Sequence, residues 1–186
     1  MSLTPSNMIA LGSQATDFSL INTIDGHTVT ASTYAHNKPM LMAFICNHCP
    51  YVIHVLDSFV TLANQYQQQG VAVIAISAND VTTHPDDAPE KMQQLAIDHD
   101  FRFPYCFDES QVVAKTYDAA CTPDFYLYNA QHELVYRGRY DASTPGTNTP
   151  VTGNDLRAAI EALLHQQPQS QQQHASLGCN IKWKST

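Results

Sequence analysis

The hydrophobic and polar positions of this chain repeat with two different periods, which predict strands alternating with helices. The runs at 40–45 and 71–77 are almost entirely apolar and too short for a stable helix, so they predict strands buried on both faces. Between them, apolar residues recur at helical spacing over 51–69, and Gly70 follows as a C-terminal stop. The same pattern predicts helices at 86–99, 109–119 and 153–165 and strands at 103–107, 125–129 and 133–140.

The two ends of the chain differ from this central pattern. Residues 17–33 alternate apolar and polar side chains around Asp25-Gly26, a dipeptide suited to a tight turn, and predict an N-terminal hairpin. Residues 166–174 are polar and low in complexity, which predicts a flexible tether before an apolar end that can dock. We therefore expect an α/β domain over 1–165, with helices on a mixed sheet whose last two strands form an antiparallel edge, and a tether with a C-terminal arm over 166–186.

Composition and charge narrow the class of function. The chain has 186 residues, of which 44% are hydrophobic, enough for one core. Nine basic against 17 acidic residues give a net charge of −8, the opposite of the basic surface that nucleic-acid binding requires. Neither a signal peptide nor a membrane span is visible. We expect a cytoplasmic protein without nucleic-acid or membrane partners, and its five cysteines indicate reactive or packed thiols rather than a disulfide scaffold.

Cys46-Asn47-His48-Cys49 is the segment that carries the clearest chemistry. The first cysteine follows a predicted buried strand and the second opens a predicted helix, so the two sulfurs can form a disulfide. Unpaired N–H groups at a helix N-terminus favour a thiolate, and a protonated neighbour such as His48 adds to this, so we expect a lowered pKa for Cys46. Cys49, one turn deeper, suits the resolving role.

Other uses of two cysteines at this spacing fit the sequence less well. A closed zinc site needs four ligands, and the remaining Cys106, Cys121 and Cys179 do not form a second pair at this spacing. Covalent haem attachment requires a histidine directly after the second cysteine, where Pro50 stands. The pattern therefore favours a redox pair with no metal and no cofactor, and Cys106 is interpreted as a core thiol.

The order of motifs resembles the thioredoxin-like superfamily, and within it the AhpC/TSA and TlpA-like branch. The similar segments are Ala15-x-Asp17-Phe18, Lys38-Pro39, Phe44-x-Cys46-x-x-Cys49-Pro50 and Cys121-Thr122-Pro123-Asp124-Phe125. The resemblance spans about residues 15–164, and the tail at 176–183 looks like the end of one subgroup of uncharacterised bacterial thioredoxin-family proteins. It implies a thioredoxin-like fold with an added N-terminal hairpin and a central β/α insertion.

The resemblance also implies roles for the loop that faces the two cysteines. Pro123 corresponds to the cis proline opposite the active-site disulfide, and Thr122 and Pro123 would present an extended substrate. His48 corresponds to the histidine that stabilises the reactive thiolate in strongly oxidising relatives. Cys121 lies two residues before Pro123, so it either bonds to Cys46, to Cys179 or to a substrate thiol, or is a buried loop thiol. The expected tether is long enough for Cys179 to form a disulfide with Cys121 or Cys46. The alternative is a docked tail in which the Cys179 side chain only packs against the domain.

The leading hypothesis is a thiol-disulfide oxidoreductase. Cys46 attacks a disulfide in a protein or small-molecule substrate, Cys49 resolves the mixed disulfide, and a thiol electron donor reduces the resulting pair. One rival is a peroxiredoxin-like thiol peroxidase with Cys46 as the peroxidatic residue and an antioxidant role. Ala43 weakens this rival because it stands where such enzymes carry a threonine, and no arginine matches theirs. A second rival is a Sco-like copper-binding module that uses Cys46, Cys49 and His54.

Overall fold

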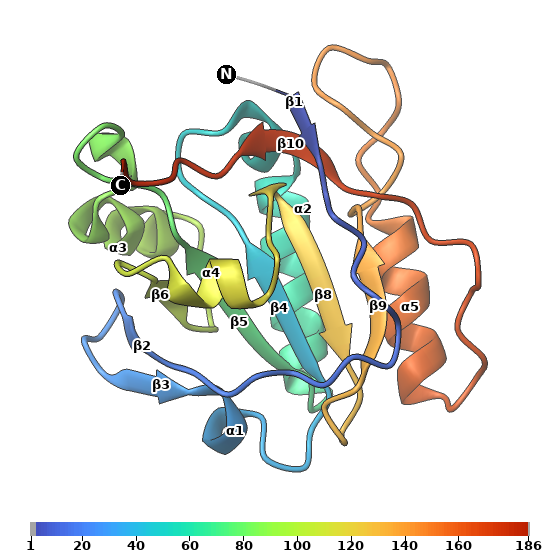
Figure 1. Ribbon diagram of the computed structural model, residues 1–186. Coiled ribbons are helices and arrows are strands. Elements are labelled where there is room, and N and C mark those ends of the chain that lie inside the picture. Colours follow the sequence, from blue (N-terminus) through green and yellow to red (C-terminus); the bar gives the residue numbers. More distant parts are fainter. Residues whose placement is uncertain (1–2, 186) are drawn as a thin grey trace.

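The computed structural model describes residues 3–185, and its main layer is a mixed seven-stranded sheet (Figure 1). Its strand order is β3-β2-β6-β5-β4-β8-β9. Parallel pairing joins the central strands β4, β5 and β6, and antiparallel pairing joins the strands toward both edges. The bounds are β2 Ser19–Asn22, β3 Thr28–Thr30, β4 Met40–Phe44, β5 Ala72–Ser77, β6 Tyr105–Phe107, β8 Asp124–Tyr128 and β9 Leu134–Gly138.

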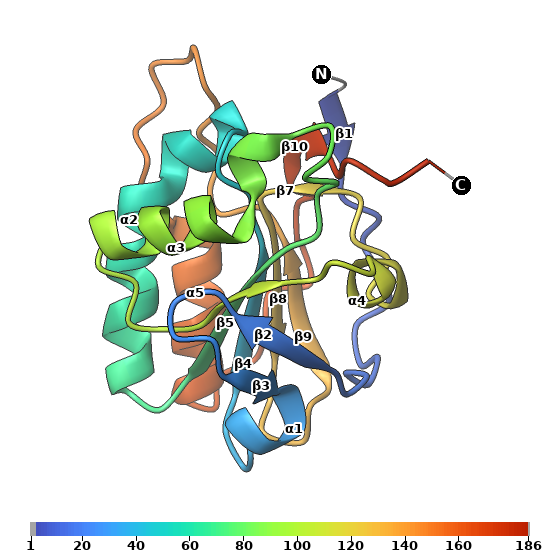
Figure 2. The ribbon, with the colours of Figure 1, turned by 90° about the vertical axis from the view of Figure 1, so that its left-hand side faces the viewer.

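Helices cover both faces of this sheet, which Figure 2 shows nearly edge-on. On one face lie α2 Pro50–Gln68, α3 Pro89–Asp98 and α5 Asn154–Leu164, whose apolar sides form a core with Leu41, Val73 and Phe125 of the sheet. The short helices α1 Ala31–Tyr34 and α4 Val112–Thr116 cover the other face. Their apolar residues form a second core with Phe44 and Tyr126 of the sheet. The central strands β4 and β5 are buried at every position, as their continuous apolar runs predict.

A second, small sheet joins the two ends of the chain to the region of Pro123. Its order is β1-β10-β7, with bounds β1 Leu3–Pro5, β7 Cys121–Thr122 and β10 Leu177–Asn180, and both pairings are antiparallel. Figure 1 shows β10 beside the end of the molecule where α2 begins. The C-terminal arm is thus a central strand of this sheet, paired on both of its edges.

The predicted mixed α/β sheet with an N-terminal hairpin and an antiparallel edge at β8 and β9 is confirmed. The strands predicted at 103–107 and 133–140 are shortened to β6 and β9, and two of the predicted helices differ more. The 86–99 segment divides into the 3-10 turn η1 Pro85–Asp87 and α3, and the 109–119 segment is helical only over α4. The residue before α4, Gln111, has a positive φ of 62°, which prevents the helix from extending toward the N-terminus.

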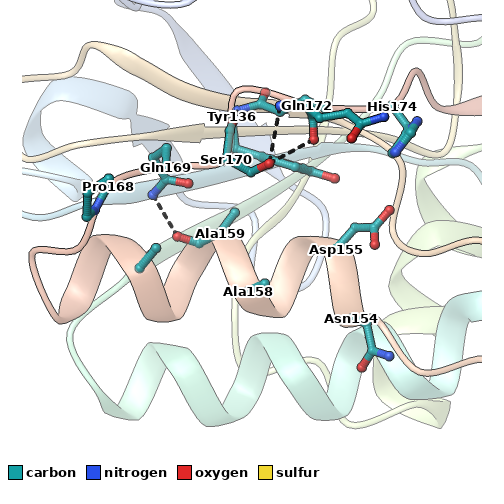
Figure 3. A pocket seen from close by; sticks show the side chains of 12 residues that line it. Tyr136, Asn154, Asp155, Ala158, Ala159, Pro168, Gln169, Ser170, Gln172 and His174 are labelled. Atoms are coloured by element: carbon teal, nitrogen blue, oxygen red, sulfur yellow. Dashed lines mark hydrogen bonds between the residues drawn. The ribbon is translucent and has the colours of Figure 1, made fainter.

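The segment predicted to be a flexible tether lies against the domain instead. Gln169 donates a hydrogen bond to the Ala159 carbonyl of α5, and Gln173 bridges Arg137 and the Val135 carbonyl of β9. A cavity of about 430 Å³ lies between this segment and α5 (Figure 3). No cysteine lines this cavity, so it lies apart from the predicted redox chemistry. Hydrogen bonds from side-chain amides attach the segment to α5 and β9, so it is bound to the domain although it has few apolar residues.

Candidate active site

Cys46 and Cys49 lie between the end of β4 and the start of α2, at one end of the central sheet. β4 ends at Phe44, Cys49 is the N-cap of α2, and Pro50 occupies the first helical position, where its missing N–H costs nothing. The exposed fractions of Cys46 and Cys49 are 1% and 0%. The strand–loop–helix position agrees with the sequence prediction, but both sulfurs are more deeply buried than a reactive pair open to solvent.

Three sulfur atoms meet at this point. The Cys46 thiol is hydrogen-bonded to Cys49, and the Cys49 Sγ lies 2.7 Å from the Sγ of Cys179 on β10. Thr122 borders the same cluster, with its Oγ1 3.4 Å from the Cys46 Sγ and its carbonyl oxygen 3.2 Å from the Cys49 Sγ. The arm therefore brings Cys179 to Cys49, and not to Cys46 or Cys121 as the sequence predicted.

The negative charge of this cluster belongs on Cys49. The hydrogen bond from Cys46 lowers the pKa of Cys49 to about 5, and smaller contributions come from Cys179 and the Val52 N–H. The same hydrogen bond, burial and the charge of Asp87 raise the pKa of Cys46. The expected lowering for Cys46 is thus reversed, because the contact between the two thiols favours the charge on Cys49 while burial and Asp87 disfavour it on Cys46. Burial and the neighbouring Cys49 raise the pKa of Cys179 to about 12.

Asp87 organises the loop between the two cysteines. This carboxylate is fully buried and accepts hydrogen bonds from the Asn47 N–H at 2.8 Å and from the Asn79 amide at 2.8 Å. Its Oδ2 also lies 2.7 Å from Nδ1 of His48, whose ring stacks on His84. His48 is therefore held by a carboxylate 39 positions away in the sequence. Residue pattern alone gave no signal for Asp87, which stands in a loop rich in proline and aspartate.

The Thr122–Pro123 peptide bond is cis, as the resemblance implies. Pro123 and Tyr51 of α2 line a cavity of about 160 Å³, which Leu177 of β10 also borders. This cavity is smaller than the one beside α5, and it reaches the cis proline, although no cysteine lines it. Cys121 is buried on β7, and burial together with the nearby Asp124 raises its pKa. A neutral, buried thiol fits the loop-packing interpretation of Cys121 better than the reactive one.

The surroundings of Cys46 differ from those expected of a peroxiredoxin. Ala43 is fully buried in the core, and the hydroxyl beside Cys46 comes from Thr122. The three arginines that the sequence analysis considered all have partners elsewhere: Arg102 pairs with Asp100, Arg137 binds the Ile9 carbonyl and Gln173, and Arg139 pairs with Asp155. Thr122 thus supplies a hydroxyl near Cys46, whereas the peroxiredoxin pattern supplies it from the position that Ala43 occupies here.

The residues named for a copper site do not come together. His54 on α2 lies 3.1 Å from the hydroxyl of Ser143, and it is not part of any metal-like cluster within residues 3–185. The one group of potential ligands there is Cys46, His48 and Asp87, whose ligand atoms lie within 4.8 Å of one another. The oxygens of Asp87 already accept hydrogen bonds, so a metal ion would have to compete with them.

Asp124 is a further buried acid that the sequence analysis quoted without giving it a role. It follows Pro123 at the start of β8 and is fully buried, and its Oδ2 accepts a hydrogen bond from Tyr126 at 2.9 Å. Its Oδ1 has no hydrogen-bond partner among the described residues. Burial raises the pKa of Asp124 to about 8. A charged residue beside the expected cis proline, inside an otherwise apolar strand, is the signal that could have identified it.

Comparisons with known proteins agree with this geometry. Two crystal structures match nearly the whole chain. One is an uncharacterized conserved protein from Geobacillus kaustophilus, with 47% identity, a TM-score of 0.97 and coverage of 100% of this chain and 98% of that one. The other is a hypothetical protein from Sinorhizobium meliloti, with 42% identity, a TM-score of 0.95 and coverage of 98% and 100%.

More distant structures share the fold. A secreted disulfide oxidoreductase from Mycobacterium tuberculosis is 16% identical with a TM-score of 0.60, covering 78% of this chain and 96% of that one. A search of curated proteins returned no match. The profile of the AhpC/TSA family matches residues 11–137, more than half of the chain. The chain therefore belongs to the AhpC/TSA family, within the thioredoxin-like superfamily.

Proposed function

We propose that this protein is a thiol-disulfide oxidoreductase whose redox centre is the Cys46–Cys49 pair. The observation that carries the proposal is the position of the two thiols at the N-terminus of α2, where Thr122 Oγ1 lies 3.4 Å from the Cys46 Sγ and the Thr122 carbonyl oxygen 3.2 Å from the Cys49 Sγ, beside the cis Pro123. The disulfide oxidoreductase from Mycobacterium tuberculosis with the same fold supports it. The substrate is a disulfide in a protein or a small molecule, and a thiol donor in a reducing compartment, the cytoplasm, regenerates the dithiol.

The geometry favours Cys46 as the attacking residue, although Cys49 carries the charge. Cys179, the Thr122 carbonyl and Cys46 lie around the Cys49 sulfur and crowd the approach of a substrate to it. Cys46 can transfer its proton to the Cys49 thiolate as its sulfur attacks the substrate, so Cys49 acts as the base. The substrate thiolate leaves with the electron pair of its disulfide bond. Cys49 then loses its proton to that leaving thiolate and attacks Cys46, which releases the second substrate thiol and forms the Cys46–Cys49 disulfide.

A peroxidase is the second candidate, because the Thr122 hydroxyl stands 3.4 Å from the Cys46 sulfur. Attack of Cys46 on a peroxide would release water or an alcohol and leave a sulfenic acid, which Cys49 would convert to the same disulfide with loss of water. The two candidates differ in the oxidising substrate. Comparing second-order rate constants for hydrogen peroxide and for a disulfide substrate separates them, and we expect the disulfide to react faster.

Trapping of the mixed disulfide tests the proposed function. Cys49→Ser protein mixed with a disulfide substrate is expected to accumulate a covalent adduct on Cys46, because the resolving sulfur is absent. Peptide mass spectrometry under non-reducing conditions locates the adduct. Cys106→Ala, which changes a buried thiol on β6 away from the pair, is the matched control and should turn over without a trapped adduct. A Cys49→Ser protein that forms no adduct at all would contradict the proposal.

The pH dependence of Cys46 reactivity gives an independent prediction. Because the pKa of Cys49 is about 5, its thiolate base is already present at pH 6. The rate of Cys46 alkylation by iodoacetamide should therefore change by less than about threefold between pH 6 and pH 8, whereas an ordinary thiol with a pKa of about 8.5 gains roughly 100-fold.

Cys49→Ser supplies the comparison for this profile. Without the Cys49 thiolate, Cys46 alkylation should slow most at pH 6 and rise steeply toward pH 8, as it does for an isolated thiol. Quantitative mass spectrometry of the Cys46 peptide measures both profiles. If the unchanged protein also shows a tenfold rise per pH unit through pH 7, Cys49 does not serve as the base.

A further inference from the structure

We propose that Cys179 is a third redox cysteine, which takes over the disulfide of the Cys46–Cys49 pair. This inference rests on the proposed function and adds a residue to its cycle. In the step, the Cys179 sulfur attacks Cys49, forming a Cys49–Cys179 bond and breaking the Cys46–Cys49 bond. The electron pair of the broken bond leaves with Cys46, which receives the proton that Cys179 loses. The exchange consumes no outside oxidant or reductant.

The distance between the sulfurs is the first support. Cys179 Sγ lies 2.7 Å from Cys49 Sγ, while a disulfide bond measures about 2.05 Å, so a shift of less than about 1 Å joins them. Both residues are buried, with exposed fractions of 0% for Cys49 and 4% for Cys179. An attacking thiol that is held beside its target does not depend on diffusion, which gives it a large advantage over a thiol in solution.

The pairing of β10 holds Cys179 in this position. Cys179 is opposite Thr122 and Asn180 opposite Cys121 in the antiparallel register with β7. The backbones approach so closely at Gly178 that a Cβ there would stand 2.0 Å from the Thr122 carbonyl oxygen. Ser176 donates a hydrogen bond to the Pro123 carbonyl at 2.5 Å. The arm is therefore seated on the same loop that borders Cys46 and Cys49, from just before to just after Cys179.

The surrounding charges keep Cys179 protonated while the Cys46–Cys49 pair is reduced and favour its thiolate when the pair is oxidised. Burial and the Cys49 thiolate keep Cys179 protonated in the reduced protein, since they raise its pKa to about 12. When Cys49 is in a disulfide with Cys46, that thiolate charge is absent and one cause of the raised pKa is removed. Lys182 lies three residues further along the arm, and its charge acts in the opposite direction and favours the Cys179 thiolate. Oxidation of the pair thus activates Cys179.

The same exchange moves the disulfide from the Cys46–Cys49 pair to the strand β10. Once the disulfide joins Cys49 to Cys179, Cys46 is a thiol again. The oxidised bond then lies between α2 and β10, a strand of four residues that follows a long loop segment. Its reduction by a thiol donor requires only that β10 separates from β7. We expect the donor to enter at this strand rather than at Cys46.

The test begins with Cys46→Ser, which removes the competing bond. This protein retains four of the five cysteines. After oxidation with a tenfold excess of oxidised glutathione, we expect non-reducing peptide mapping to find a Cys49–Cys179 bridge in most molecules, with release of reduced glutathione. Cys49 found only as its glutathione adduct, or bridged to Cys121, overturns the proposal.

Two further variants keep the result interpretable. Gly178→Ala should reduce the yield of the bridge at least tenfold by unseating β10, and circular dichroism checks that the domain is folded. Cys179→Ser should still form Cys46–Cys49 with oxidised glutathione, but its Cys46 should regain reactivity toward iodoacetamide at least tenfold more slowly than in the unchanged protein. Cys106→Ala is the matched control and should behave as the unchanged protein in both measurements.

The failures of the two proposals are distinguishable. If Cys179→Ser forms no Cys46–Cys49 disulfide and reduces no disulfide substrate, the proposed function fails. If it forms the pair normally while the unchanged protein never yields a Cys49–Cys179 bridge, the proposed function stands and the role of Cys179 is wrong. Equal rates of Cys46 recovery with and without the Cys179 thiol also reject that role.

Discussion

Replacing Cys46 with serine is expected to reduce disulfide-reductase activity by a factor on the order of 10³ or more. A serine hydroxyl is not ionised near neutral pH and cannot form the mixed disulfide that starts the cycle. Cys49 would remain, but it would lose the Cys46 thiol that lowers its pKa, and Cys179 and the Thr122 carbonyl oxygen crowd its sulfur at 2.7 Å and 3.2 Å. The measurement is the steady-state reduction of a protein disulfide with dithiothreitol as the electron donor.

The control for this substitution is Cys106→Ala, which removes a fully buried thiol on the central sheet. It should lower stability slightly through a small cavity but leave the rate within about twofold, because the substitution is distant from the reacting atoms. Thermal unfolding of both variants separates loss of chemistry from loss of folding. A Cys46→Ser protein that keeps more than about a tenth of the activity would show that Cys49 attacks substrates directly.

The central fold was predictable because its signals are local. The apolar run that became β4 and the helical spacing that became α2 are each contained in fewer than 20 residues. The turn at Gly26, with a positive φ of 76°, likewise follows from a dipeptide. The position of Cys46 and Cys49 between strand and helix follows from the same periodicities, so the pair could be identified before the structure was available.

The features that periodicity missed depend on contacts between distant segments. Cys49 and Cys179 are 130 positions apart, and the strands β7 and β10 that bring them together have only two and four residues, too few to show a period. The polar segment before β10 is held by side-chain amides, which composition does not reveal. The pKa order of Cys46 and Cys49 likewise depends on burial and on the distant Asp87, which no local pattern shows.

The largest effect on stability is expected at Asp124. Its pKa is about 8 in the folded protein and about 3.9 in an unfolded chain, so the folded protein binds the proton more tightly. Between these two values the unfolded state holds fewer protons, and the free energy of unfolding therefore falls as the pH rises. Four pH units at about 1.36 kcal/mol each make the full loss on the order of 5 kcal/mol, complete above pH 8.

Asp124→Asn removes this dependence because the amide does not ionise. At pH 5 the carboxyl is neutral in the folded wild type, and only about one pH unit of the loss, roughly 1.4 kcal/mol, has occurred through ionisation of the unfolded chain. From pH 5 to pH 8.5 the variant should gain on the wild type by several kcal/mol, or roughly 10 °C in melting temperature for a chain of this size. Urea unfolding at a series of pH values measures the difference.

Asp86→Asn is the matched control, since it removes the same charge from an exposed position directly before the buried Asp87. Its unfolding free energy relative to wild type should stay nearly constant over this pH range. The carbonyl stretching band of a protonated carboxylic acid gives a direct second readout, and it should be present at pH 6 in the wild type and absent from Asp124→Asn. A constant difference between wild type and Asp124→Asn from pH 5 to pH 8.5 would mean that Asp124 keeps one ionisation state throughout this range and that burial does not raise its pKa to about 8.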